Sequence, residues 1–301
     1  MHAVEIKNVK KEYPKTKALK GVNFHIKKGD FFGFIGPNGA GKTTTINAIM
    51  GLVKYEGEIL VDGLNSEKEY IKVRKKLGFA PQEENFDHFL TAEQTLSYSA
   101  GFFGLKKQEA KEQTELMLKE FGLYEHRKKN IRHLSGGMKR RLLIARALVH
   151  KPEIIILDEP TSGMDVELRR EFWNLLTKIN KQGTTILLTS HYIEEVERLC
   201  NTVCIINKGE ILALDKKEDI MEDLSNQELQ LKTNKPIPKA IIEKKGFKIE
   251  TNGTITKIYG RGIRKNAKKI IDQVEKTGIN VEEINMVNDS LEQVFLRLTK
   301  K

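Results

Sequence analysis

Runs of hydrophobic residues alternate with longer amphipathic segments in the middle of the chain. The segments EIIILDEP (153–160) and TTILLTSH (184–191) are apolar over most of their length, which predicts strands buried on both faces of a sheet. Between them, ELRREFWNLLTKINKQG (167–183) has the spacing of an amphipathic helix that a glycine closes. Apolar strands that alternate with such helices predict a parallel sheet covered by helices on both faces.

The N-terminal part of the chain has shorter strands separated by turns. Strands are expected at AVEIKNV (3–9), ALKGVNFHI (18–26), GDFFGFIG (29–36), GEILVDG (57–63) and, leading into a loop, KKLGFAPQEE (75–84). The third strand runs into a glycine-rich loop, and TTTINAIMGL (43–52) continues from that loop as a helix. Near the other end of the core, VCIINKGEILAL (203–214) predicts a strand, a Lys-Gly turn and another strand.

The segment from Thr91 to position 150 interrupts this alternation because its pattern is mostly helical. TAEQTLSYSAGFFG and KKQEAKEQTELMLKEFGL predict two helices, and KRRLLIARAL (139–148) predicts a third with its apolar residues on one side. We therefore expect a helical subdomain, at about 88–150, inserted into the α/β core.

After about residue 220 the pattern changes again. The segments from NQELQLKT to SLEQVFLRLT predict the order β-α-β-β-α-β-α, with PKAIIEKKG (238–246) as the first helix. That order suggests a small ferredoxin-like α+β domain. The expected division is thus a large domain at 1–220 and a small accessory domain at 221–301, which could stabilise a dimer or regulate it.

Composition places the chain among globular proteins, with 39% hydrophobic and 31% charged residues among 301. It has no apolar run of about 18 residues, and the charged start MHAVEIKNVKKEYP does not fit a signal peptide, so neither membrane insertion nor secretion is expected. The net charge of +11 suits either a solvated lysine-rich surface, which we favour, or an anionic partner such as nucleic acid. Cys200 and Cys204 are expected as small buried residues, one near a helix end and one in a strand.

The glycine-rich loop GPNGAGKT (36–43) has the spacing G-x-x-x-x-G-K-[ST] between a strand and a helix. The backbone N–H groups of 38–43 can surround a β-phosphate, and the helix N-terminus adds about half a positive charge. Lys42 can reach the β- and γ-oxygens, and the Thr43 hydroxyl can bind Mg²⁺.

The strand IIILDE (154–159) supplies two acids to the same site. Asp158 is expected at the Mg²⁺ ion, and Glu159 at the water that attacks the γ-phosphate. A carboxylate in that place acts as a base or orients the water.

A second glycine-rich helix start, LSGGM (134–138), cannot easily serve the same nucleotide because the first loop already encloses the triphosphate. One face of the γ-phosphate stays open, however. A second copy of the chain, related by a two-fold axis, could offer Ser135, Gly136 and Gly137 to that face. This arrangement predicts a dimer that holds two nucleotides between its chains.

With these motifs in order, residues 1 to about 220 resemble the ATP-binding cassette (ABC) proteins, the nucleotide-binding subunits of ATP-driven transporters. The resemblance implies an α/β P-loop NTPase cassette, with a RecA-like core, an antiparallel β-subdomain and an inserted helical subdomain. It implies ATPase activity with ATP and Mg²⁺, a second cassette chain and a multi-span membrane permease as partners, and a place on the cytoplasmic face of the membrane. Nucleic acid is not expected as a partner.

The resemblance also implies site residues. The phosphate loop comprises Gly36, Pro37, Asn38, Gly39, Ala40, Gly41, Lys42, Thr43 and Thr44. Tyr13 stands where the family stacks an aromatic ring on adenine, and Asp165 lies in SGMD (162–165), the loop that crosses the dimer interface. Gln82 is similar to the glutamine that touches magnesium and water and relays to the membrane subunit. His191 is similar to the histidine that contacts the γ-phosphate and holds Glu159, so the implied catalytic set is Glu159, His191, Lys42 and Gln82.

Simpler interpretations remain open for four of these residues. Tyr13 would then be a strand-end aromatic, Gln82 a loop amide, His191 a core histidine, and Asp165 the cap of the helix that starts near Val166.

Two features bear on the kind of transporter. Position 138 is Met where many family members have Gln, and NDSLEQVFLRLT (288–299) is similar to a segment of export-type (ABC-2-type) cassettes. Export is therefore expected rather than import. The alternative is a soluble ABC-type ATPase that acts on ribosomes or nucleic acid, which only the positive charge favours.

Overall fold

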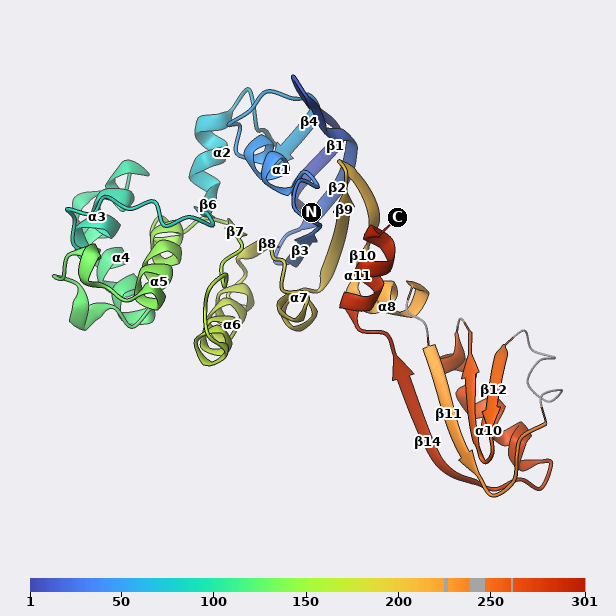
Figure 1. The fold of residues 1–301 in the computed structure, drawn as a ribbon. Coiled ribbons are helices and arrows are strands. Elements are labelled where there is room, and N and C mark those ends of the chain that lie inside the picture. Colours follow the sequence, from blue (N-terminus) through green and yellow to red (C-terminus); the bar gives the residue numbers. More distant parts are fainter. Residues whose placement is uncertain (225–226, 239–246, 261, 301) are drawn as a thin grey trace. The chain divides into compact units, whose positions relative to one another are not determined.

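A computed structural model describes residues 1–224, 227–238, 247–260 and 262–300. These residues cluster into two compact units, Met1–Leu214 and Asp215–Lys301. Figure 1 traces the elements of both units along the chain. Among the described residues, no helix has both the length and the apolar composition that a bilayer span needs.

The first unit contains an antiparallel sheet in the order β2-β1-β4-β5. Its strands are β1 (His2–Tyr13), β2 (Thr16–Lys27), β4 (Glu56–Val61) and β5 (Leu64–Asn65). Val4, Ile6 and Val9 of β1 are buried while most of their neighbours are not, so one face of this sheet supplies the core.

A six-stranded sheet in the order β10-β9-β3-β8-β7-β6 forms the centre of the same unit. Its strands are β3 (Phe31–Ile35), β6 (Leu77–Ala80), β7 (Ile154–Asp158), β8 (Thr185–Thr189), β9 (Thr202–Asn207) and β10 (Glu210–Lys216). From β9 to β6 the neighbouring strands are parallel, as the sequence predicts. Because β3, β7 and β8 are parallel, the residues that follow them meet at one edge of the sheet.

Four helices of this unit lie near the two sheets (Figure 1). They are α1 (Lys42–Ile49), α2 (Tyr70–Lys76), α6 (Val166–Lys181) and α7 (Ile193–Leu199). The sequence predicts α1 and α6 but neither α2 nor α7. Each of those has only seven residues, and α2 buries only Val73, so their apolar spacing is too short to recognise.

Three longer helices, α3 (Ala92–Phe102), α4 (Lys107–Glu120) and α5 (Gly136–Leu148), pack together at one side of the unit (Figure 1). The short 3₁₀ turns Tyr124–His126 and Ile131–His133 connect α4 to α5. Thr91 begins α3 with a capping box that includes Gln94, which satisfies two N–H groups at the helix start. The helices lie within the segment that the sequence assigns to a helical subdomain.

The second unit contains an antiparallel sheet in the order β12-β13-β11-β14. Its elements are α8 (Lys217–Leu224), β11 (Gln227–Thr233), β12 (Lys248–Asn252), β13 (Ile255–Tyr259), α10 (Ile263–Glu275), β14 (Val281–Asn288) and α11 (Leu291–Thr299). Ile270 and Val274 of α10 belong to one apolar cluster with Leu229 and Leu231 of β11. The helix expected at 238–246 falls almost wholly outside the described residues, so the ferredoxin-like fold stays a prediction.

Both cysteines are buried, as expected. Cys200 follows the last residue of α7, and Cys204 lies in β9. Burial raises the pKa of the Cys204 thiol far above its ordinary value.

Candidate functional site

The phosphate loop joins β3 to α1 and requires glycine at the residue that precedes the helix. Gly41 is the N-cap of α1 with φ +112°, and a Cβ there would lie 2.7 Å from the Ala18 carbonyl oxygen. A glycine cannot cap the helix with a side chain. The N–H groups of the first turn of α1 are thus available to an anion, and the helix dipole favours negative charge at the same place.

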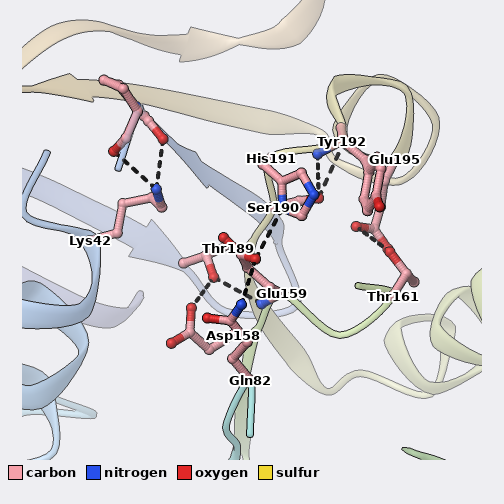
Figure 2. Close-up of polar contacts among 12 residues, drawn as sticks. Lys42, Gln82, Asp158, Glu159, Thr161, Thr189, Ser190, His191, Tyr192 and Glu195 are labelled. Atoms are coloured by element: carbon pink, nitrogen blue, oxygen red, sulfur yellow. Dashed lines mark hydrogen bonds and ion pairs between the residues drawn. The ribbon is translucent and has the colours of Figure 1, made fainter. Parts of the chain in front are cut away.

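Lys42 is folded back onto this loop. Its Nζ donates to the carbonyl oxygens of Gly36 at 2.6 Å and Pro37 at 3.2 Å (Figure 2). Burial lowers the pKa of the Lys42 ammonium, and the charges of Glu159 and Asp158 oppose that shift. The structure therefore brings the lysine and the two acids of the predicted site together.

Asp158, the last residue of β7, is 8% exposed. Burial raises the pKa of its carboxyl group, while a hydrogen bond that the Thr189 hydroxyl donates to Oδ1 at 2.5 Å lowers it. The bond forms because Asp158 and Thr189 are paired across β7 and β8. A divalent cation would stabilise the charge of a buried carboxylate of this kind.

Glu159 has a positive φ of 48°, which non-glycine residues rarely adopt. Its N–H donates to the Thr189 carbonyl oxygen at 3.0 Å, which helps to hold this backbone. Such backbone strain is often found at functional sites.

The Glu159 carboxylate joins two other predicted residues. Its Oε2 accepts a hydrogen bond from Gln82 Nε2 at 3.1 Å and lies 3.0 Å from His191 Nδ1 (Figure 2). A carboxylate accepts, so Nδ1 carries the proton in this contact. Gln82 follows β6, Glu159 follows β7 and His191 follows β8. The three interacting side chains therefore come from the ends of three strands of one sheet. A core position for His191 is excluded, since its side chain is 45% exposed.

The second glycine-rich motif begins α5 at the surface. Ser135 is the N-cap, and its hydroxyl accepts from the Met138 N–H at 3.3 Å. Ser135 and Gly136 are exposed, and a Cβ on Gly137 would lie 2.6 Å from Leu168 Cδ2. Among the described residues, no hydrogen bond or ion pair joins Ser135 to Lys42, Asp158 or Glu159. The motif is thus open to another molecule.

Tyr13 and Asp165 do not belong to the hydrogen-bonded group of Gln82, Glu159 and His191. Tyr13 ends β1 and is 39% exposed, with Lys11 Nζ 4.9 Å from its ring centroid. Asp165 is the N-cap of α6 and accepts from the Leu168 N–H at 2.8 Å. The capping role that the sequence allows for Asp165 is therefore present.

Sequence reasoning missed three polar residues around the site: Thr189, Glu195 and Arg140. Glu195 of α7 is fully buried and accepts hydrogen bonds from Thr161 Oγ1 and Trp173 Nε1 (the first is drawn in Figure 2). Thr189 is a hydroxyl at the end of an apolar strand, and Arg140 is a charge on the apolar side of a helix. A polar residue in a buried stripe is the pattern that could have identified each.

Comparisons with known proteins agree on one family. A family model described as "ABC transporter" matches residues 19–162. The chain is 36% identical to the linearmycin resistance ATP-binding protein LnrL of Bacillus subtilis, over 98% of both proteins. It is 37% identical to the Nod factor export ATP-binding protein I of Burkholderia thailandensis, over 73% of this chain and 72% of that protein.

Solved structures give the same result. The dimeric ATP-binding cassette MJ0796, in a post-hydrolysis state bound to ADP and Pi, superposes with a TM-score of 0.65 and is 32% identical over 71% of this chain and 98% of that one. The protein cbiO1 from Clostridium perfringens, part of the transporter complex cbiONQ, gives a TM-score of 0.67 and 30% identity over 73% and 90% of the two chains.

Proposed function

The chain belongs to the ATP-binding proteins of ABC transporters, and from this premise we propose that its ATP-driven dimerisation powers export through a separate membrane subunit. The contact of Gln82 and His191 with the Glu159 carboxylate carries the proposal, because it fixes an acid whose charge acts on Lys42 of the phosphate loop. The printed names of two relatives, one for export and one for resistance, support outward transport. No comparison supports the ribosome or nucleic-acid alternative.

The described residues fit a bound MgATP. The first turn of α1 and Lys42 would receive the β- and γ-phosphates. Thr43, Gln82 and the buried Asp158 would hold Mg²⁺, which when bound neutralises charge on the phosphate oxygens. Tyr13, exposed at the strand end, would stack on adenine.

Glu159 would orient the attacking water and accept its proton, and the water oxygen would bond to the γ-phosphorus as the bond to ADP breaks. Gln82 and His191 restrict the carboxylate to one orientation, so it is already placed when the water arrives. Lys42 and the N–H groups of the loop offset the negative charge that is redistributed in the transition state.

The surface position of LSGGM supports a nucleotide site shared by two chains. The exposed Ser135 and Gly136 of one chain would face the γ-phosphate bound to the other. Asp165 and the rest of SGMD (162–165) would lie across the interface. Each dimer would then hold two nucleotides.

A groove beside α3 would receive a short helix of the membrane permease. Its volume is about 240 Å³, and its lining includes Phe102, Phe103 and Arg146 together with Leu77 and Phe79 of β6. Phe102 is 86% exposed, which is unusual for a large apolar side chain without a partner. Because β6 leads directly to Gln82, a helix in this groove would act on the catalytic loop and hold the chain at the cytoplasmic face of the membrane.

Glu159→Gln tests the catalytic part of the proposal. The variant should bind ATP as the parent does, because Lys42 and the phosphate loop are unchanged. Phosphate release should fall by about 10²–10⁴-fold, since the amide cannot act as a base. A trapped dimer should appear with ATP in size-exclusion chromatography. Normal phosphate release by this variant would remove Glu159 from its role.

Affinity capture tests the transport part. Tagged Glu159→Gln chain with ATP should recover a multi-span membrane protein from gently solubilised membranes, and Phe102→Asp in the same background should lose it. Recovery of ribosomes, with the chain in the soluble fraction, would favour the alternative function.

A further inference from the structure

Arg140 is a buried charge in the first half of α5. It is 6% exposed, and Leu143 and Ile144 in the next turn of the helix are fully buried. A buried charge destabilises a fold unless hydrogen bonds compensate the loss of its hydration. Its partners should therefore explain why it is there.

The guanidinium of Arg140 has five N–H groups, and each finds a backbone carbonyl oxygen. The acceptors come from two segments and are Pro81, Gln82, Asp158, Glu159 and Pro160. Nη1 lies 3.1 Å from the Pro81 oxygen and 2.8 Å from the Gln82 oxygen. Nε donates to Pro160 at 2.5 Å, and Nη2 donates to Asp158 at 3.4 Å and to Glu159.

The two segments are those that carry Gln82 and Glu159, whose side chains meet at 3.1 Å. Arg140 thus joins the main chains of these two segments, in addition to the hydrogen bond between the Gln82 and Glu159 side chains. A lysine could not replace this arrangement, because an ammonium has three donors at one point and no planar fork.

We propose that Arg140 is a positioning residue that fixes the Gln82 and Glu159 backbones at the spacing in which Gln82 orients the catalytic carboxylate. The inference rests on the proposed function, because it assigns Arg140 to the same hydrolysis site. Arg140 and the surface motif of Ser135 lie on one helix, because α5 begins at Gly136. Arg140 therefore links that motif to the spacing between the Gln82 and Glu159 backbones. A displacement of α5 would move both segments together.

Arg140→Lys tests the proposal, with Arg127→Lys as the matched control. Arg127 also donates to a backbone carbonyl, that of Tyr124 at 2.9 Å, and lies over the Tyr124 ring, but it contacts none of the site residues named above. Arg140→Lys should lower kcat for ATP hydrolysis by about 10²-fold, the loss expected from a small misplacement of a catalytic group. ATP affinity is compared between the parent and Arg140→Lys, each carrying Glu159→Gln to prevent hydrolysis, and the two values should be equal. The control Arg127→Lys should keep the parent kcat.

A double-mutant cycle separates positioning from general damage. If Arg140 acts through Gln82, then Gln82→Ala combined with Arg140→Lys should lose no more activity than the worse single variant. Losses that multiply, or a parent-like kcat for Arg140→Lys, would overturn the proposal. An absence of hydrolysis in the parent itself would instead overturn the proposed function.

Arg140→Gln covers the case in which the lysine variant does not fold, because it removes the buried charge and keeps two N–H donors. The same kcat loss, unchanged ATP affinity and non-additivity are expected of it. Failure of both variants to fold, with Arg127→Lys folded, would also overturn the proposal, because a purely structural role would then suffice.

Discussion

At the scale of single residues, the site depends on polar groups that other side chains hold in place. Asp158 is buried, and the Thr189 hydroxyl offsets part of the cost of its charge. Burial is the larger influence and leaves the pKa of Asp158 above its ordinary value. A carboxyl group with a raised folded-state pKa takes up protons on folding, so Asp158 lowers the stability of the empty site as pH rises through its titration range.

Thr189→Val should therefore weaken Mg²⁺ binding. Without the hydroxyl the pKa of Asp158 rises further, and a protonated carboxyl group cannot bind the ion. We expect the Mg²⁺ concentration for half-maximal ATPase activity to rise by about 10–100-fold, and the loss to grow as pH falls. Thr185→Val is the control, because that hydroxyl accepts from Gly29 N–H at the other end of β8. An unchanged Mg²⁺ dependence in Thr189→Val would contradict the role assigned to this bond.

At the scale of elements, the sequence predicted the helices and strands that are long or that carry a motif. The strands β7 and β8 and the helix α6 follow from apolar spacing alone, whereas α2 and α7 are too short for any spacing to be recognised. The site shows the same limit. GPNGAGKT and IIILDE identify Lys42 and Glu159, but the acceptors of Arg140 lie 18 to 59 positions away along the chain, and only the folded sheet brings them together.

Asp165 tests whether a helix cap and an interface contact can share one side chain. Asp165→Ala should lower the free energy of unfolding by about 1 kcal/mol in urea titrations, because α6 loses its N-cap. Asp165→Asn keeps an accepting oxygen and should stay close to the parent in stability. Lower ATPase activity in the folded Asn variant would assign the charge to the dimer interface. Parent-like stability of the Ala variant would show that the cap contributes little.

At the scale of the whole molecule, the proposed shared site requires each chain to carry two complementary halves. The phosphate loop and Glu159 would form one half, and the exposed start of α5 would form the other. Because the phosphate loop of one chain would need the start of α5 from a second chain, activity should depend on the concentration of the chain.

Ser135→Arg separates the two halves. The isolated variant should bind ATP normally, because its phosphate loop is intact, but hydrolysis should be blocked, since a long side chain fills the space of the γ-phosphate. Mixing it with Glu159→Gln provides a further check. A two-fold dimer of the two variants would contain one composite site with both defects and one with neither, so some activity should return. Full ATPase activity of Ser135→Arg alone would exclude the shared site.

The burial of both cysteines has a practical consequence. Cys200 is 1% exposed and Cys204 is not exposed at all, so neither should react quickly with maleimides or spin labels in the folded chain. A new thiol introduced at an exposed position of the second unit, Asp215–Lys301, would then be the one that labels. The native sequence can in this way serve as its own background for distance measurements between two chains during the ATP cycle.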